Sequence, residues 1–160
     1  MTELAISHMQ LADIEKVWQI EKQSNRFPWS KGNFEAIRNL AQEYLTQAED
    51  YKSDWNYGNA IHHSNLILGK VALREKKIEE AKIYLLKAGR TSGSSQLKSF
   101  GPNMSLAKEL LEIGENEIVL EYLDLCKIFW RKIFSWWKIR KWKRVIRKGG
   151  IPDFGANLVY

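Results

Sequence analysis

The chain has 160 residues, which fits one domain, and its content of 44% hydrophobic and 28% charged residues is ordinary for a soluble globular protein. Its single cysteine, Cys126, excludes an internal disulfide and suits the reducing cytoplasm. The net charge of +6 comes from residues 127–148, which hold ten Lys or Arg and no Asp or Glu.

Nearly all of the chain follows a helical period, and only residues 3–7 (ELAIS) resemble a short strand. The predicted helices are 11–24, 33–50, 58–74, 77–89, 104–113, 116–130 and 131–148. No apolar run approaches the roughly 20 residues of a membrane span, and no secretory signal is visible. The predicted fold class is therefore all-α, with at most one short N-terminal strand.

Residues 1–37 contain the helical segment ADIEKVWQIEKQS followed by FPWSKGNF. This segment resembles the start of a ribosomal-protein alanine N-acetyltransferase of the GNAT family. The resemblance implies acetyl-CoA as cofactor and a PWS segment that shapes the acceptor side of a cleft. We treat residues 1–37 as a GNAT-like fragment, with N-terminal acetylation of a protein as the alternative function.

In that family a [RQ]-x-x-G-x-[GA] loop holds the cofactor, because its N–H groups and the following helix neutralise the pyrophosphate. The near match is RTSGSS, in which Arg90 and Gly93 are the candidate cofactor-binding residues. Ser95 replaces the last Gly or Ala, and the preceding residues predict a helix instead of a strand. No general base or acid has a plausible place, so we assign no catalytic residue and expect no complete catalytic site.

Residues 38–126 carry a repeated pattern of small and large apolar residues. The spacing of Ala41, Leu45 and Ala48 recurs 40 residues later, which is typical of stacked helical hairpins. The segment NLILGKVALREKKIEEAKIYLLKAG resembles a tetratricopeptide repeat, and residues 38–160 resemble bacterial repeat proteins of unassigned activity. The predicted repeat-packing residues are Leu68, Gly69, Ala81, Leu85 and Ala88. A looser copy has Ala107, Leu110, Val119, Leu123 and Cys126.

The repeat resemblance implies antiparallel helical hairpins stacked in a superhelix, and protein–protein interaction through its concave face. The candidate partner-binding residues lie on the first helix of the best copy. They are Asn59, His62, His63, Asn65 and Leu66. Adjacent histidines point about 100° apart on a helix and cannot share one metal by themselves, so we expect one to be buried, one exposed, and no metal site.

The loop at residues 89–105 is long for a connection between helices. Such a loop either binds a ligand or is held against the repeats by its apolar residues. We favour the second alternative, with Leu97 and Phe100 as anchors and Ser105 as the cap of the next helix.

Residues 127–148 combine the basic window with four tryptophans. The basic patch consists of Arg140, Lys141, Lys143, Arg144, Arg147 and Lys148. Three roles fit: a helix that covers the last hairpin, an arm for nucleic acid, and a helix for an anionic membrane surface. We favour the covering role, with the first half buried and the second half exposed. Residues 149–160 form a tail in which Phe154, Leu158 and Tyr160 fold back as a strap.

Overall fold

The computed structural model describes residues 31–131 and 133–159. The predicted strand at 3–7, the predicted helix at 11–24 and most of the acetyltransferase-like motif lie outside these residues. The structure divides the chain into two units, Met1–Glu35 and Ala36–Tyr160, with the division inside the first described helix. The second unit holds the repeat-like segment, the basic helix and the tail, which pack together.

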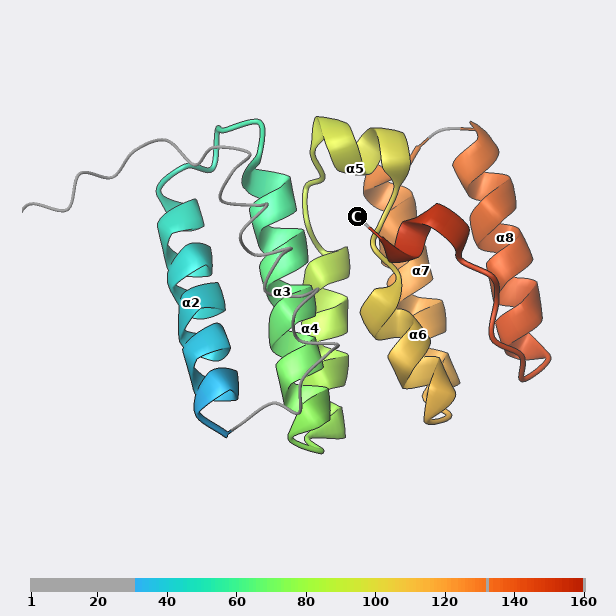
Figure 1. Ribbon diagram of the computed structural model, residues 1–160. Coiled ribbons are helices and arrows are strands. Elements are labelled where there is room, and N and C mark those ends of the chain that lie inside the picture. Colours follow the sequence, from blue (N-terminus) through green and yellow to red (C-terminus); the bar gives the residue numbers. More distant parts are fainter. Residues whose placement is uncertain (1–30, 132, 160) are drawn as a thin grey trace, which may run out of the picture. The chain divides into compact units, whose positions relative to one another are not determined.

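The described part of the chain is built from helices and contains no strand (Figure 1). The elements are α2 (Lys31–Glu49), α3 (Tyr57–Arg74), α4 (Ile78–Gly89), α5 (Ser95–Phe100), α6 (Ser105–Glu112), α7 (Asn116–Phe129), α8 (Ile133–Arg147) and the 3-10 helix η1 (Gly155–Leu158). The all-α prediction is confirmed. The six predicted helices from residue 33 onward match α2, α3, α4, α6, α7 and α8 to within two residues at each end. The short helix α5 was not predicted.

Two hairpins form the body of the second unit. Helices α3 and α4 pack against each other along their length, and α4 also contacts α7, the partner of α6. Figure 1 shows α4 and α7 side by side between α3 and α8. The core therefore lies between the hairpins, where Leu85, Leu110 and Leu123 are fully buried. Burial of each such side chain stabilises the fold by about 1.5–3 kcal/mol.

The turns of the two hairpins have the same backbone geometry. At the end of α3, Lys76 has a φ of 62°, and the Lys77 N–H donates to the Ala72 carbonyl at 2.9 Å. At the end of α6, Gly114 has a φ of 88°, and the Glu115 N–H donates to the Leu110 carbonyl at 3.0 Å. Both turns are Schellman-type C-caps with one left-handed residue. Each residue of the first turn is equivalent to the residue 38 positions later in the second turn.

Gly69 lets the first hairpin approach the second. A β-carbon at this position would lie 2.3 Å from Leu106 Cδ2, and 3.2 Å from Tyr84 Cβ. Any side chain would therefore force α3 away from α4 and α6. The predicted packing residues Leu68, Gly69, Ala81, Leu85 and Ala88 are all buried.

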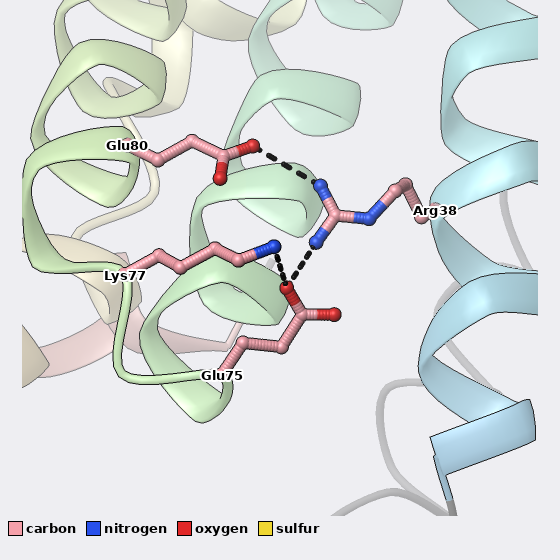
Figure 2. Close-up of polar contacts among 4 residues, drawn as sticks. All are labelled: Arg38, Glu75, Lys77 and Glu80. Carbon is pink, nitrogen blue, oxygen red and sulfur yellow. Dashed lines mark hydrogen bonds and ion pairs between the residues drawn. The ribbon is translucent and has the colours of Figure 1, made fainter.

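Helix α2 meets the first hairpin through a group of charged side chains (Figure 2). The Arg38 guanidinium donates to Glu75 at 2.6 Å and to Glu80 at 3.1 Å, and Lys77 pairs with the same Glu75 oxygen at 2.7 Å. At the other end of α2, the Tyr57 hydroxyl donates to Glu49 at 3.1 Å. These side chains are partly or largely exposed, so solvent screens the pairs and each contributes little to the stability of the contact.

The link between α4 and α6 is held against the hairpins, as predicted for Leu97 but not for Phe100. Leu97 is 3% exposed, whereas Phe100 is 63% exposed and lies at the end of α5. The prediction that Ser105 caps α6 is also wrong. Met104 is the N-cap residue and makes no side-chain cap, while the Asn103 side chain accepts from the Ser105 N–H at 2.9 Å.

The tail returns across the molecule as the predicted strap. Phe154 is 1% exposed and packs edge-to-face on Trp142, with ring centroids 5.0 Å apart. The Asn157 amide donates to the carbonyls of Pro102 and Phe100, at 2.8 and 3.2 Å. Leu158 packs against the core, and Tyr160 lies outside the described residues. The strap therefore joins α8 to the residues before α6.

Candidate functional site

His62 is the centre of a buried polar network between the two hairpins. It is fully buried, and Nδ1 lies 3.0 Å from the Ala88 carbonyl oxygen. Nε2 accepts from the Asn103 N–H at 3.1 Å, so the proton must be on Nδ1, where it is donated to Ala88. Burial, together with the charge of neighbouring His63, lowers the pKa of His62 to about 3. His62 is thus neutral at physiological pH.

Aromatic rings enclose this imidazole. Tyr122 stacks on it with centroids 6.5 Å apart, and Phe129 meets it edge-to-face at 6.1 Å. The Tyr122 hydroxyl donates to the Asn103 carbonyl at 3.0 Å. The network therefore fixes the link before α6 against α3, α4 and α7.

Asn59 organises a second set of hydrogen bonds, one turn before His62. Its amide donates to Asn56 at 2.6 Å and to Gln96, and its oxygen accepts from the Ser94 hydroxyl at 2.6 Å. The Ser94 hydroxyl oxygen in turn accepts from the Leu97 N–H at 3.0 Å, which caps α5. In the described part of the chain no buried side-chain nitrogen or oxygen lacks a hydrogen-bond partner.

These positions correct the expectation for the partner-binding candidates. Asn59, His62, Asn65 and Leu66 are each 4% exposed or less, so they do not line an exposed surface. The three polar side chains of this group form hydrogen bonds within the fold, as when the Asn65 amide donates to the Ile61 carbonyl at 2.7 Å. His63 is partly exposed. Sequence reasoning expected one buried and one exposed histidine, but it could not identify Asn103 as the partner of His62.

The cofactor candidates Arg90 and Gly93 lie just after α4, not after a strand. Arg90 is exposed, and the Gly93 N–H donates to Thr91 Oγ1 at 3.2 Å. Thr91 Oγ1 donates to the Gly58 carbonyl at 2.9 Å. A β-carbon on Gly58 would lie 2.0 Å from the Gly93 carbonyl oxygen, so the loop is packed directly on α3. The Gly93 N–H is used within the loop.

The single thiol lies inside the core. Cys126 is fully buried, and burial raises the pKa of its thiol well above the ordinary value. The predicted buried thiol is confirmed. Among the described residues no group of three or more His, Cys, Asp or Glu side chains could hold a metal ion.

Helix α8 differs from the expectation that its first half is buried. Phe134, Trp136 and Trp137 are 85%, 50% and 61% exposed. The buried residues instead follow one stripe along the whole helix: Ser135, Ile139, Trp142, Lys143 and Ile146. Apolar residues lie on almost every side of the first half of the helix, so the buried stripe could not be predicted from the sequence.

The basic patch is exposed at five of its six positions: Arg140, Lys141, Arg144, Arg147 and Lys148. Lys143 is the exception, because it is 8% exposed and its ammonium donates to Asp124 at 2.6 Å. Lys143 therefore belongs to the α7–α8 contact. The covering role of α8 is visible in Ile139, Trp142 and Ile146, which belong to the core.

A shallow depression of about 610 Å³ lies at the hairpin turns. It is lined by Leu73, Arg74, Lys76, Ile78, Glu109, Glu112 and Ile113. Ile78 and Ile113 are 37% and 49% exposed, and Arg74 pairs with Glu109 across it. Apolar and oppositely charged groups therefore share one accessible surface, to which both hairpins contribute.

Within the part of the chain that the structure describes, no helix is long and apolar enough to cross a membrane. Comparison of the chain with protein-family models, with curated proteins and with solved structures found no match.

Proposed function

We propose that the chain is a protein-interaction module built from two tetratricopeptide-like hairpins, α3–α4 and α6–α7. The observation that carries this proposal is the equivalence of the two hairpins at an offset of 38 residues. The left-handed residues of the turns, Lys76 and Gly114, share this offset, and so do the closing hydrogen bonds. Repeated hairpins of this kind expose helix faces and turns to partners while small residues pack between them.

Small and apolar residues occupy the equivalent packing positions of both hairpins. In the first hairpin they are Gly69, Ala81, Leu85 and Ala88, and in the second they are Ala107, Val119, Leu123 and Cys126. All eight are buried. This burial supports the tetratricopeptide alignment. The hairpins depart from that pattern at Ala72 and Leu110, where an aromatic residue is usual.

The partner surface we propose is the depression at the hairpin turns. Ile78 and Ile113 offer apolar area, and Arg74, Lys76, Glu109 and Glu112 provide charges of both signs around it. Such a surface suits a peptide or protein edge with a central apolar side chain and charged neighbours, since apolar anchors and a polar rim are common at interfaces.

The test uses the variant Ile78→Glu/Ile113→Glu. Proteins captured by the wild-type chain are identified by quantitative mass spectrometry, and the Kd of each purified candidate is then measured by calorimetry. Ile83→Glu is the matched control, because Ile83 is 53% exposed on α4 and outside the depression. For a true partner we expect the double variant to raise the Kd at least tenfold. The control should bind with the wild-type Kd.

Equal binding by the double variant and the wild type would exclude this surface. Titration of acetyl-CoA into the full chain addresses the enzyme alternative on the same material. Saturable acetyl-CoA binding that is lost in Arg90→Ala would contradict the non-catalytic proposal.

A further inference from the structure

The outward face of α8 carries aromatic and basic residues that do not pack in the core. Phe134, Trp137, Lys141 and Arg144 follow one another at spacings of three and four residues, which places them on one face of the helix. This face lies opposite the buried stripe of Ser135, Ile139, Trp142 and Ile146. The aromatic residues come first along the stripe and the basic residues follow.

The aromatic end of the stripe is unusually exposed. Phe134, at 85%, is the most exposed large apolar side chain in the described part of the chain. Trp136 and Trp137 meet edge-to-face with centroids 5.4 Å apart, and Ile128, 58% exposed, lies near the end of α7. Large apolar side chains are therefore exposed to water both at the start of α8 and near the end of α7.

The same region carries positive charge that carboxylates do not balance. Residues 127–148 contain no Asp or Glu, and within the described residues only Lys127 and Lys143 of this segment pair with an acid, Asp124 in both cases. Arg131, Arg140, Lys141, Arg144, Arg147 and Lys148 are exposed, and Lys138 is partly exposed and donates to the Asn157 side-chain oxygen. A ligand that fits this face is therefore one that is anionic and also accepts apolar groups.

We propose that this face of α8 docks on an anionic membrane surface. Phe134 and Trp137 insert among the lipid head groups and upper acyl chains, while Lys141 and Arg144 lie over the lipid phosphates. Burial of a phenyl group among acyl chains is favourable, and indole rings favour the interfacial layer. Exposed Lys and Arg side chains bind anionic leaflets.

A nucleic acid is the other polyanion that Lys and Arg could bind, but the rings fit it less well. Base stacking requires an open aromatic face. The Arg140 guanidinium covers one face of the Trp136 ring, 5.3 Å from its centroid, so this ring cannot stack a base on that side. Phe134 precedes the cations at one end of the stripe, where it is suited to insertion into a lipid layer.

The test is sedimentation of the full chain with vesicles. One set contains phosphatidylcholine alone, and the other contains equal parts of phosphatidylcholine and phosphatidylglycerol. We expect partition into the anionic set only, weakening as salt rises from about 0.05 to 0.2 M. Phe134→Ser/Trp137→Ser should reduce partition at least about tenfold. Lys141→Gln/Arg144→Gln should reduce it about 25-fold, or fivefold per cation.

Two control variants match these substitutions elsewhere on the surface. Trp55→Ser removes a tryptophan that is 56% exposed in the link before α3, and Arg90→Gln/Lys98→Gln removes two exposed cations near α5. Both should partition like the wild type. Circular dichroism of every variant should match the wild type, because all substituted side chains are exposed.

Three results would overturn the proposal. The first is equal partition into neutral and anionic vesicles or into neither. The second is unchanged partition of both α8 variants. The third is binding of a fluorescent single-stranded oligonucleotide, measured by anisotropy, that depends on Phe134 and Trp137 while the anionic vesicles remain unbound.

Discussion

The buried histidine makes the stability of the fold depend on pH in a window where few other groups titrate. The pKa of His62 is about 3 in the folded chain and about 6.5 when exposed, because burial disfavours the imidazolium. In the folded state Nε2 already accepts a hydrogen bond from the Asn103 N–H, so protonation there would place two donors against each other.

The direction in which the free energy of unfolding changes with pH follows from proton binding. Between pH 6.5 and 3 the unfolded chain binds a proton at this residue and the folded chain does not, so the free energy of unfolding falls as pH falls. The loss is about 1.4 kcal/mol per pH unit, which gives about 2 kcal/mol between pH 7.5 and 5. Glu75 and Asp124 have a pKa lowered in the fold from 4.5 and 3.8, so their contribution to stability is lost mainly below pH 5.

Urea unfolding at the two pH values, followed by circular dichroism, measures this loss. In His62→Gln the amide cannot be protonated, so we expect a lower stability at both pH values but almost no difference between them. His63→Gln, with the adjacent and partly exposed histidine replaced, should keep the wild-type difference. A His62→Gln variant that still lost about 2 kcal/mol would refute the assignment.

Three further predictions concern packing and turns, each measured by urea unfolding. Ala81→Glu puts a carboxylate at a position with no exposure and should cost at least about 3 kcal/mol, whereas Ile83→Glu on the same helix should cost less than about 0.5 kcal/mol. Equal effects would contradict the packing alignment. Lys76→Gly should raise stability by about 0.5–1 kcal/mol, since glycine adopts the left-handed backbone more easily, as Gly114 does in the second turn; a loss of stability would contradict it. Asn157→Ala leaves two strap-bound carbonyls without their donor and should cost about 2–3 kcal/mol, and an unchanged midpoint would mean that the strap is not held there.

The helices could be predicted because the sequence marks them locally. Apolar residues at helical spacing define α3, α4 and α7, and Gly114 marks the turn between α6 and α7. The packing positions of the first hairpin followed from the spacing of Ala81, Leu85 and Ala88, which are all buried.

The surfaces could not be predicted, because they depend on contacts between distant segments. His62 and Asn59 were candidates for partner binding, but Asn103 and Ser94, 41 and 35 residues later in the chain, form hydrogen bonds with them inside the fold. In α8, the stripe that contacts α7 and Phe154 determines which aromatic residues are buried. Periodicity alone cannot predict which of them are buried when apolar residues lie on nearly every side of the helix.

The buried thiol provides a reporter of opening without any substitution. Cys126 is the only cysteine, and a reagent can reach it only when α7 separates from the core. Since burial also raises the pKa of the thiol, the closed state contains almost no reactive thiolate. The rate at which a thiol reagent labels the unaltered chain therefore gives the free energy of that opening under native conditions. A ligand that binds the closed fold, whether a protein or a membrane, would slow the labelling in proportion to its affinity.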